Sequence, residues 1–248
     1  MNNKENILVI GIGGCSRSGK TLLVNELISQ YYKGNKANNF SDIIEEMHLD
    51  DYANYQKVMA NKYKTNLGNI YGNWEFSGSL DWDNFYQDIK EKIKNMNLKI
   101  QRDAKHKNRK GILILEGFLI FSPLISIQAY NNEYLNLFDI LIFISLNKSI
   151  AKMRRMKTTS VPNDYYEEIL WPEYIKNCSK YINYFINNTI TFIQIIIFNH
   201  FIYNLLQIIN IIIKAIFIFI NINLNNFIIF IIIFIQNFIQ IKFCFIIS

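Results

Sequence analysis

Short apolar runs and amphipathic stretches alternate along the first two thirds of the chain. Residues 7–12 form an unbroken apolar run that ends at two glycines, a pattern typical of a strand buried on both faces. In residues 19–31 the apolar side chains recur every three or four positions, which predicts a helix with one buried stripe. A strand, a glycine turn and a helix in this order predict the opening of an α/β domain.

The same alternation continues further along the chain. Apolar runs predict three more strands, at residues 43–49, 112–115 and 139–146. Asp81 is placed to cap a helix. The inner face of that helix is expected to carry Trp82, Phe85, Ile89, Ile93 and Met96. The pattern therefore favours an α/β fold with a doubly wound, mostly parallel sheet and helices on both faces.

Three segments are predicted from weaker signals. Residues 52–80 are rich in Tyr, Asn and Gly without clean periodicity, so we expect an irregular segment that faces the substrate. Residues 105–110 are basic and predict a polar loop. A further helix is expected to begin at Trp171-Pro172, because proline is tolerated in the first helical turn.

Composition narrows the class of protein. The chain has 248 residues, a net charge of +6 and 50% hydrophobic residues, which excludes a wholly disordered chain. Its three cysteines are not spaced with another Cys or His as metal ligands would be, so a reducing, cytoplasmic setting is expected. The polar residues 1–6 are unlike a secretory signal peptide. The mild positive charge suits phosphate ligands, and no nucleic-acid partner is expected.

The strongest motif follows the first predicted strand. It matches the pattern G-x-x-x-x-G-K-[ST] in the strand-to-helix context that the pattern requires. Its residues are Gly14, Cys15, Ser16, Arg17, Ser18, Gly19, Lys20 and Thr21. The glycines let successive backbone N–H groups face a phosphate group, Lys20 supplies a cation for the β and γ phosphates, and Thr21 offers a hydroxyl to Mg²⁺. The motif therefore predicts a nucleotide-binding site.

Carboxylates at the ends of two strands indicate what is done with the nucleotide. Asp50 and Asp51 follow one predicted strand and Glu116 ends another, at the edge where a doubly wound sheet places its ligands. Phosphoryl transfer to an alcohol needs such a carboxylate near the acceptor hydroxyl. A GTP-binding switch would need N-K-x-D, and residues 147–150 lack the aspartate. A small-molecule kinase fits better.

Several segments together are similar to the nicotinamide riboside kinases, a branch of the uridine kinase-like P-loop kinases. The similarity extends over residues 7–182. Besides the glycine loop, its motifs are His48-Leu49-Asp50-Asp51-Tyr52, Asn73-Trp74-Glu75, Ser79-Leu80-Asp81-Trp82, Leu115-Glu116-Gly117-Phe118-Leu119-Ile120-Phe121, the helix from Lys152 to Arg155, and Asn163-Asp164-Tyr165-Tyr166 leading to Leu170-Trp171-Pro172-Glu173-Tyr174. The resemblance implies a P-loop kinase fold, ATP and Mg²⁺ as cofactors, and a nucleoside as substrate.

The resemblance also implies a role for individual residues in the chemistry. Asp50 corresponds to the carboxylate that orients or deprotonates the ribose 5′-hydroxyl. Glu116 corresponds to the residue that helps to hold Mg²⁺ through water, and Thr21 completes that metal site. Lys20 is the third residue expected to take part in catalysis.

On the substrate side, the resemblance assigns Trp74 to the position of an aromatic ring against the nicotinamide. A cationic pyridinium is attracted to such a ring, although Trp74 could instead be a core residue. Glu75 stands where the family has an aspartate that binds the ribose hydroxyls, so substrate affinity is in question. Arg155 matches an arginine that shares the ribose and Arg154 is a candidate for binding phosphate, whereas plain surface cations are the alternative for both.

The lid between Arg155 and Asn163 differs from that of the family. It is short and lacks a further arginine and a second aromatic residue. Because cations in a lid stabilise the transferred phosphoryl group, we expect slow turnover.

The expected domain boundary lies at residue 184, because residues 185–248 are almost entirely Ile, Asn and Phe. A last strand is expected within 189–197. Uncharged stretches at 185–213 and 215–241 are long enough to span a bilayer, although their asparagines disfavour lipid. Three explanations stay open: translated noncoding sequence, since AT-rich codons favour these residues, a membrane anchor, or a soluble terminus.

The sequence thus predicts phosphorylation of the ribose 5′-hydroxyl of nicotinamide riboside by ATP, giving nicotinamide mononucleotide for NAD synthesis. Uridine or cytidine kinase activity is the alternative within enzymes. A catalytically impaired, membrane-associated nucleotide-binding protein is the alternative outside them.

Overall fold

A parallel sheet lies at the centre of the computed structural model, which describes residues 6–35, 43–102, 111–122, 134, 137–158, 161–187 and 192–197. Five strands lie in the spatial order β2-β5-β1-β6-β7, and each neighbouring pair is parallel. The strands are β1 (Ile7–Gly14), β2 (Ile43–His48), β5 (Gly111–Gly117), β6 (Ile140–Leu146) and β7 (Phe192–Ile197). The central strands β1, β5 and β6 are buried almost throughout, as their unbroken apolar runs predict.

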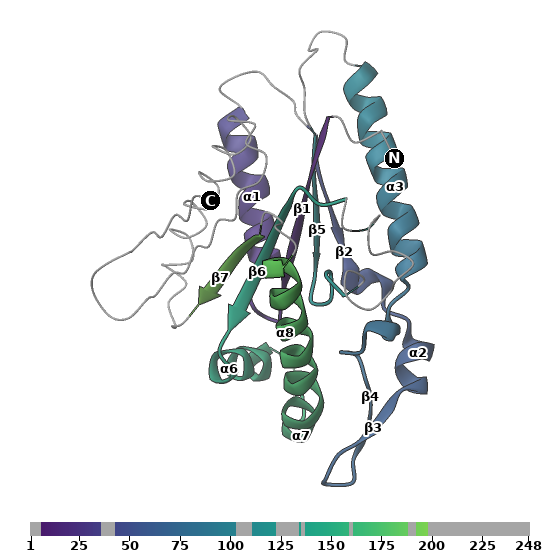
Figure 1. Ribbon diagram of the computed structural model, residues 1–248, viewed down its shortest axis with the longest axis vertical. Coiled ribbons are helices and arrows are strands. Elements are labelled where there is room, and N and C mark those ends of the chain that lie inside the picture. The colour runs from purple at the N-terminus through teal and green to yellow at the C-terminus, as the bar shows by residue number, and fades with distance from the viewer. Residues whose placement is uncertain are drawn as a thin grey trace, which may run out of the picture.

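Helices cover both faces of this sheet. The long helices are α1 (Lys20–Asn35), α3 (Trp82–Arg102) and α8 (Trp171–Asn187). Shorter helical elements lie near the carboxyl ends of the strands: α6 (Lys148–Thr158), α7 (Asn163–Tyr165) and the π-helical turn η4 (Tyr166–Leu170). The crossover from β1 to β2 runs across the sheet in the opposite direction to that from β2 to β5. Right-handed crossovers therefore place α1 and α3 on opposite faces, as Figure 1 shows. The expected α/β class with a parallel sheet is confirmed.

Helix α3 follows its sequence prediction closely. The backbone N–H of Asn84 donates to Asp81 Oδ1 at 3.3 Å, so Asp81 caps the helix. All five residues expected on the inner face are buried. The helical period of the apolar residues was sufficient to predict the buried face of α3, because a surface helix packs one apolar stripe against the sheet.

The segment 52–80, which was expected to be irregular, and the turn before it are more regular than expected. They form the 3-10 turn η2 (Leu49–Tyr52), α2 (Tyr55–Ala60), the antiparallel hairpin of β3 (Lys62–Lys64) and β4 (Ile70–Gly72), and the 3-10 turn η3 (Ser77–Ser79). The prediction of an irregular segment was therefore wrong for much of this region. These elements are too short to leave a period in the sequence, and Asn54 and Gly68 mark them only by a helix cap and a left-handed turn.

The helix expected to begin at Trp171 starts earlier. The chain is helical from Asn163 through η4 into α8, which passes residue 184 and ends at Asn187. Strand β7 then lies inside the stretch where a last strand was expected, and it pairs with β6. Within the residues that the structure describes, no helix is both long and apolar enough to cross a membrane. The polar loop at 105–110 and most of the apolar tail lie outside the described residues.

Candidate active site

The glycine loop between β1 and α1 bends as the motif predicts. Gly14 has a φ of 146° and Gly19 a φ of 104°, values in the region that favours glycine. A Cβ atom at Gly14 would lie 2.4 Å from the backbone oxygen of Ile144 on β6, so a side chain there would collide with the sheet. The backbone N–H of Ser18 donates to the carbonyl of Cys15 at 3.0 Å and closes the turn. The loop therefore leads directly to the N-terminus of α1, where backbone N–H groups can bind an anion.

Lys20 lies beneath this loop and is only 7% exposed. Its Nζ atom donates to the carbonyl oxygen of Cys15 at 3.1 Å. The Cys15 side chain is buried too, and burial raises the pKa of its thiol to about 12. A protonated thiol is a poor nucleophile, so Cys15 contributes to the loop by its backbone.

Thr21, at the start of α1, reaches across to the end of β5. Its Oγ1 atom lies 3.1 Å from each carboxylate oxygen of Glu116, which is 5% exposed. The Nδ1 atom of His48 also lies 3.1 Å from Glu116 Oε1. His48 and Glu116 are direct neighbours in the parallel pairing of β2 and β5. Sequence reasoning assigned no role to His48, because only the register of the two strands brings this pair together.

Asp50 follows β2 in the turn η2, on the same edge of the sheet. Desolvation has the largest effect on its carboxyl and raises the pKa above the usual range; nearby Lys20 acts to lower it and Glu116 to raise it. Lys20 and Glu116 therefore both lie within electrostatic range of Asp50, although Asp50 keeps much of its surface exposed. The structure therefore brings the three residues expected to be catalytic to one place.

Glu75 lies close to the same group and is 8% exposed. Burial raises the pKa of its carboxyl to about 7, while Arg155 and Lys20 act to lower it and Asp50 to raise it. Glu75 shares the lining of a small cavity with Cys15 and Ser16 of the glycine loop. Glu75, which was expected to bind the ribose hydroxyls, thus lies against the glycine loop.

Both arginines of α6 contact the glycine loop. Arg155 Nη1 donates to Ser16 Oγ at 2.6 Å. Arg154 Nη1 lies 3.5 Å from the carbonyl of Arg17 and 3.4 Å from that of Ser18. These contacts argue against the alternative that the arginines are plain surface cations, because each guanidinium is directed at the loop.

Trp74 is not a core residue, because its side chain is 43% exposed. Its ring lies beside that of Tyr55, with centroids 6.1 Å apart and planes tilted by 46°. Two exposed aromatic side chains therefore lie together, one of them on the residue that precedes Glu75 in the chain.

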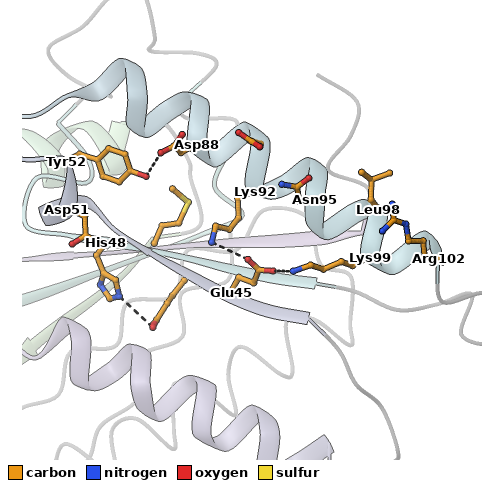
Figure 2. Close-up of a pocket in the computed structure, with 13 residues that line it drawn as sticks. Glu45, His48, Asp51, Tyr52, Asp88, Lys92, Asn95, Leu98, Lys99 and Arg102 are labelled. Carbon is orange, nitrogen blue, oxygen red and sulfur yellow. Dashed lines mark hydrogen bonds and ion pairs between the residues drawn. The ribbon is translucent and has the colours of Figure 1, made fainter.

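A larger groove of about 640 Å³ runs between β2 and α3, and Figure 2 shows the side chains that line it. Its charged side chains largely pair with one another. Lys92 and Lys99 lie 3.2 and 2.6 Å from the carboxylate of Glu45, and Tyr52 donates to Asp88 at 2.7 Å. Asp51 lines this groove, whereas none of the glycine-loop residues does. Of the two neighbouring aspartates, Asp51 therefore lines this groove and Asp50 does not.

The side chains at Thr21 and Glu116 fit Mg²⁺. Both offer oxygen ligands, which this ion prefers, and they lie next to the phosphate loop. Among the described residues there is no cluster of three or more His, Cys, Asp or Glu that could hold a metal. Mg²⁺ in nucleotide enzymes is typically held by one or two protein side chains together with phosphates and water, so this pair is sufficient.

Comparisons with known proteins give sequence relatives among nucleoside kinases. No protein-family model matches the chain. The chain is 25% identical over 201 residues to a uridine kinase of Borrelia duttonii, covering 77% of this chain and 86% of that protein. It is 26% identical over 180 residues to nicotinamide riboside kinase 2 of Mus musculus, covering 68% and 78%. A solved structure of deoxyadenosine kinase from M. mycoides superposes with a TM-score of 0.39 at 17% identity, covering 84% of this chain and 100% of that chain. The two sequence relatives are kinases, which supports a phosphotransferase.

Proposed function

We propose that this protein is an ATP-dependent kinase that phosphorylates the ribose 5′-hydroxyl of nicotinamide riboside. The observation that carries the proposal is the convergence of Lys20, Asp50 and Glu116 beside a glycine loop, with Glu75 and an exposed tryptophan next to them. The first three residues serve phosphoryl transfer from a nucleotide. The last two are suited to a ribose carrying an aromatic base.

In the proposed mechanism the loop binds the ATP phosphates through its backbone N–H groups, and Lys20 neutralises charge on the β and γ phosphates. Thr21 and Glu116 would hold Mg²⁺, which supplies positive charge to the phosphate oxygens when bound. Arg154 lies against the loop and can add a further cation as charge shifts during transfer.

Asp50 is proposed to orient the acceptor hydroxyl and to take its proton. The hydroxyl oxygen forms the new bond to the γ-phosphorus while the bond to the β-phosphate oxygen breaks and ADP leaves. The raised pKa of Asp50 makes the carboxylate a stronger base than an ordinary aspartate. Nearby Lys20 acts to lower the pKa of Asp50 and so favours the ionised carboxylate, which is the form that accepts the proton.

The choice of nucleoside rests on the neighbours of Glu75. The exposed ring of Trp74 can attract the cationic pyridinium of nicotinamide riboside, an interaction that neutral uracil lacks. Glu75 can accept hydrogen bonds from the 2′ and 3′ hydroxyls, and Arg155 lies within electrostatic range of it. Uridine is the second candidate, because a uridine kinase is among the relatives that align with most of the chain.

The test measures ADP release with nicotinamide riboside, uridine and pantothenate side by side, using the full chain. We expect the highest kcat/KM with nicotinamide riboside, and a preference for uridine would overturn that choice. Asp50→Asn should lower kcat by about 100-fold or more. The matched variant Asp51→Asn should retain activity, since Asp51 lines the groove beside α3, which no residue of the glycine loop lines. Equal losses in both variants would contradict the role given to Asp50.

A further inference from the structure

The β3–β4 hairpin has little structure of its own. Each strand has three residues, and all three side chains of β3 are exposed. A two-stranded hairpin of this size is at best marginally stable in water. Figure 1 shows that it projects from the body of the molecule next to α7, so its position depends on what it contacts there.

One carboxylate gathers the side chains of this hairpin. Asp164, on α7, is 8% exposed. Its Oδ2 atom accepts hydrogen bonds from Thr65 Oγ1 at 2.8 Å and Asn69 Nδ2 at 2.9 Å, and its Oδ1 atom accepts one from Tyr71 OH at 3.1 Å. We call these three bonds the Asp164 clamp. Hydrogen bonds to a charged acceptor are roughly twice as strong as neutral ones. The buried Asp164 carboxylate with its three donors therefore holds the hairpin against α7.

Two neighbouring contacts extend the same interface. The backbone N–H of Asn66 donates to Glu168 Oε2 at 2.9 Å. The rings of Tyr71 and Tyr165 pack edge to face, with centroids 5.4 Å apart. The hairpin therefore joins α7 and η4 by polar and apolar contacts together.

The clamp connects the two sides of the candidate active site. On the hairpin side, β4 is followed after one residue by Trp74 and Glu75. On the other side, Glu167 of η4 pairs with Lys148 and Lys152 of α6, the helix that also carries Arg155. A displacement of the hairpin would therefore move Glu75 relative to Arg155.

We propose that Asp164 is a positioning residue, which holds the hairpin so that Trp74 and Glu75 face the arginines of α6 in the geometry that binds the nucleoside. This inference rests on the proposed kinase function and deepens it. The clamp is distant in sequence from the glycine loop and touches none of its residues. Losing it should weaken nucleoside binding and leave ATP binding unchanged.

The experiment compares the full-length chain with Asp164→Asn, Tyr71→Phe and the double variant, with the exposed Glu91→Gln as control. In Asp164→Asn an amide that donates replaces one accepting oxygen, so at least one bond of the clamp is lost. We expect the KM for the nucleoside to rise about tenfold, and the KM for ATP and the kcat at saturating nucleoside to change less than about twofold. The double variant should lose less than the product of the two single effects.

Hydrogen exchange of residues 62–72 tests the clamp without any turnover. We expect these amides to exchange faster in Asp164→Asn than in wild type, and unchanged exchange would overturn the inference. Parallel changes in the two KM values would also overturn it, because they indicate a general structural defect. If the wild type phosphorylates no nucleoside, the proposed function fails. Calorimetry then tests the Asp164 clamp separately: nucleoside dissociation constants that are equal in wild type and Asp164→Asn would reject it.

Discussion

Relative to wild type, the Glu75→Gln variant should become more stable as the pH rises. Glu75 is 8% exposed, and burial raises the pKa of its carboxyl from 4.5 to about 7, against the opposing effects of Arg155 and Lys20. In the unfolded chain the carboxyl titrates near its ordinary value. The folded state therefore binds the proton of Glu75 more tightly than the unfolded state does.

The magnitude follows from this difference in pKa. A group with a raised pKa in the folded state contributes stability that is fully present below the unfolded pKa and is lost as the pH rises through the folded pKa. Each pKa unit corresponds to about 1.4 kcal/mol. The shift from 4.5 to about 7 then predicts that Glu75 removes about 3 kcal/mol from the free energy of unfolding between pH 4.5 and pH 8. Glutamine does not titrate, so Glu75→Gln lacks this loss.

The assay is urea unfolding followed by tryptophan fluorescence at several pH values from 4.5 to 8. The measured quantity is the difference in unfolding free energy between Glu75→Gln and wild type, since other titrating groups cancel in it. We expect this difference to grow in favour of the variant by about 3 kcal/mol across the range. The exposed Glu91→Gln serves as the matched control variant. A difference for Glu75→Gln that stays constant to within about 0.5 kcal/mol would refute the reasoning.

Three further changes test the site. Lys20→Met should lower kcat by about 100-fold or more, because a buried cation at the phosphates is lost, and steady-state ADP release measures this. Thr21→Val should raise the Mg²⁺ concentration for half-maximal activity about tenfold, since one oxygen ligand disappears, while Ser149→Ala on α6 should not. Lys157→Arg or Thr158→Arg should raise kcat about tenfold if the thin lid limits turnover, and no gain from either would argue against slow turnover by the lid.

The residues proposed to bind the nucleotide could be predicted from the sequence because their signals are local. The strand, the glycine turn and the helix are contiguous, and the loop conformation follows from glycines at positions where a side chain would clash or strain the backbone. Glu116 was identified because a charged residue stood directly after a buried apolar run. Such signals need no knowledge of which strands are neighbours.

The residues proposed to bind the nucleoside, and the contacts that position them, were less predictable from the sequence. The β3–β4 hairpin left no period in the sequence, and its attachment is to Asp164, which lies 93 to 99 residues further along the chain from its three donors. The pairing of His48 with Glu116 depends on the register of two strands that are separated by α3. Neither contact has a sequence signature, because hydrogen-bonding residues carry no label of their distant partner.

By itself, the sequence determined that this chain builds a bent glycine loop at the start of an α/β domain and places carboxylates at the ends of its strands. Backbone sterics and the burial of apolar runs act over neighbouring residues, so these features can be inferred from a single chain. Only the tertiary structure decided that Glu75 lies near Lys20 and Asp50, and that Asp51 lines a groove that Asp50 does not line. Strand order and register bring residues together from across the chain, and they result from packing the whole sheet.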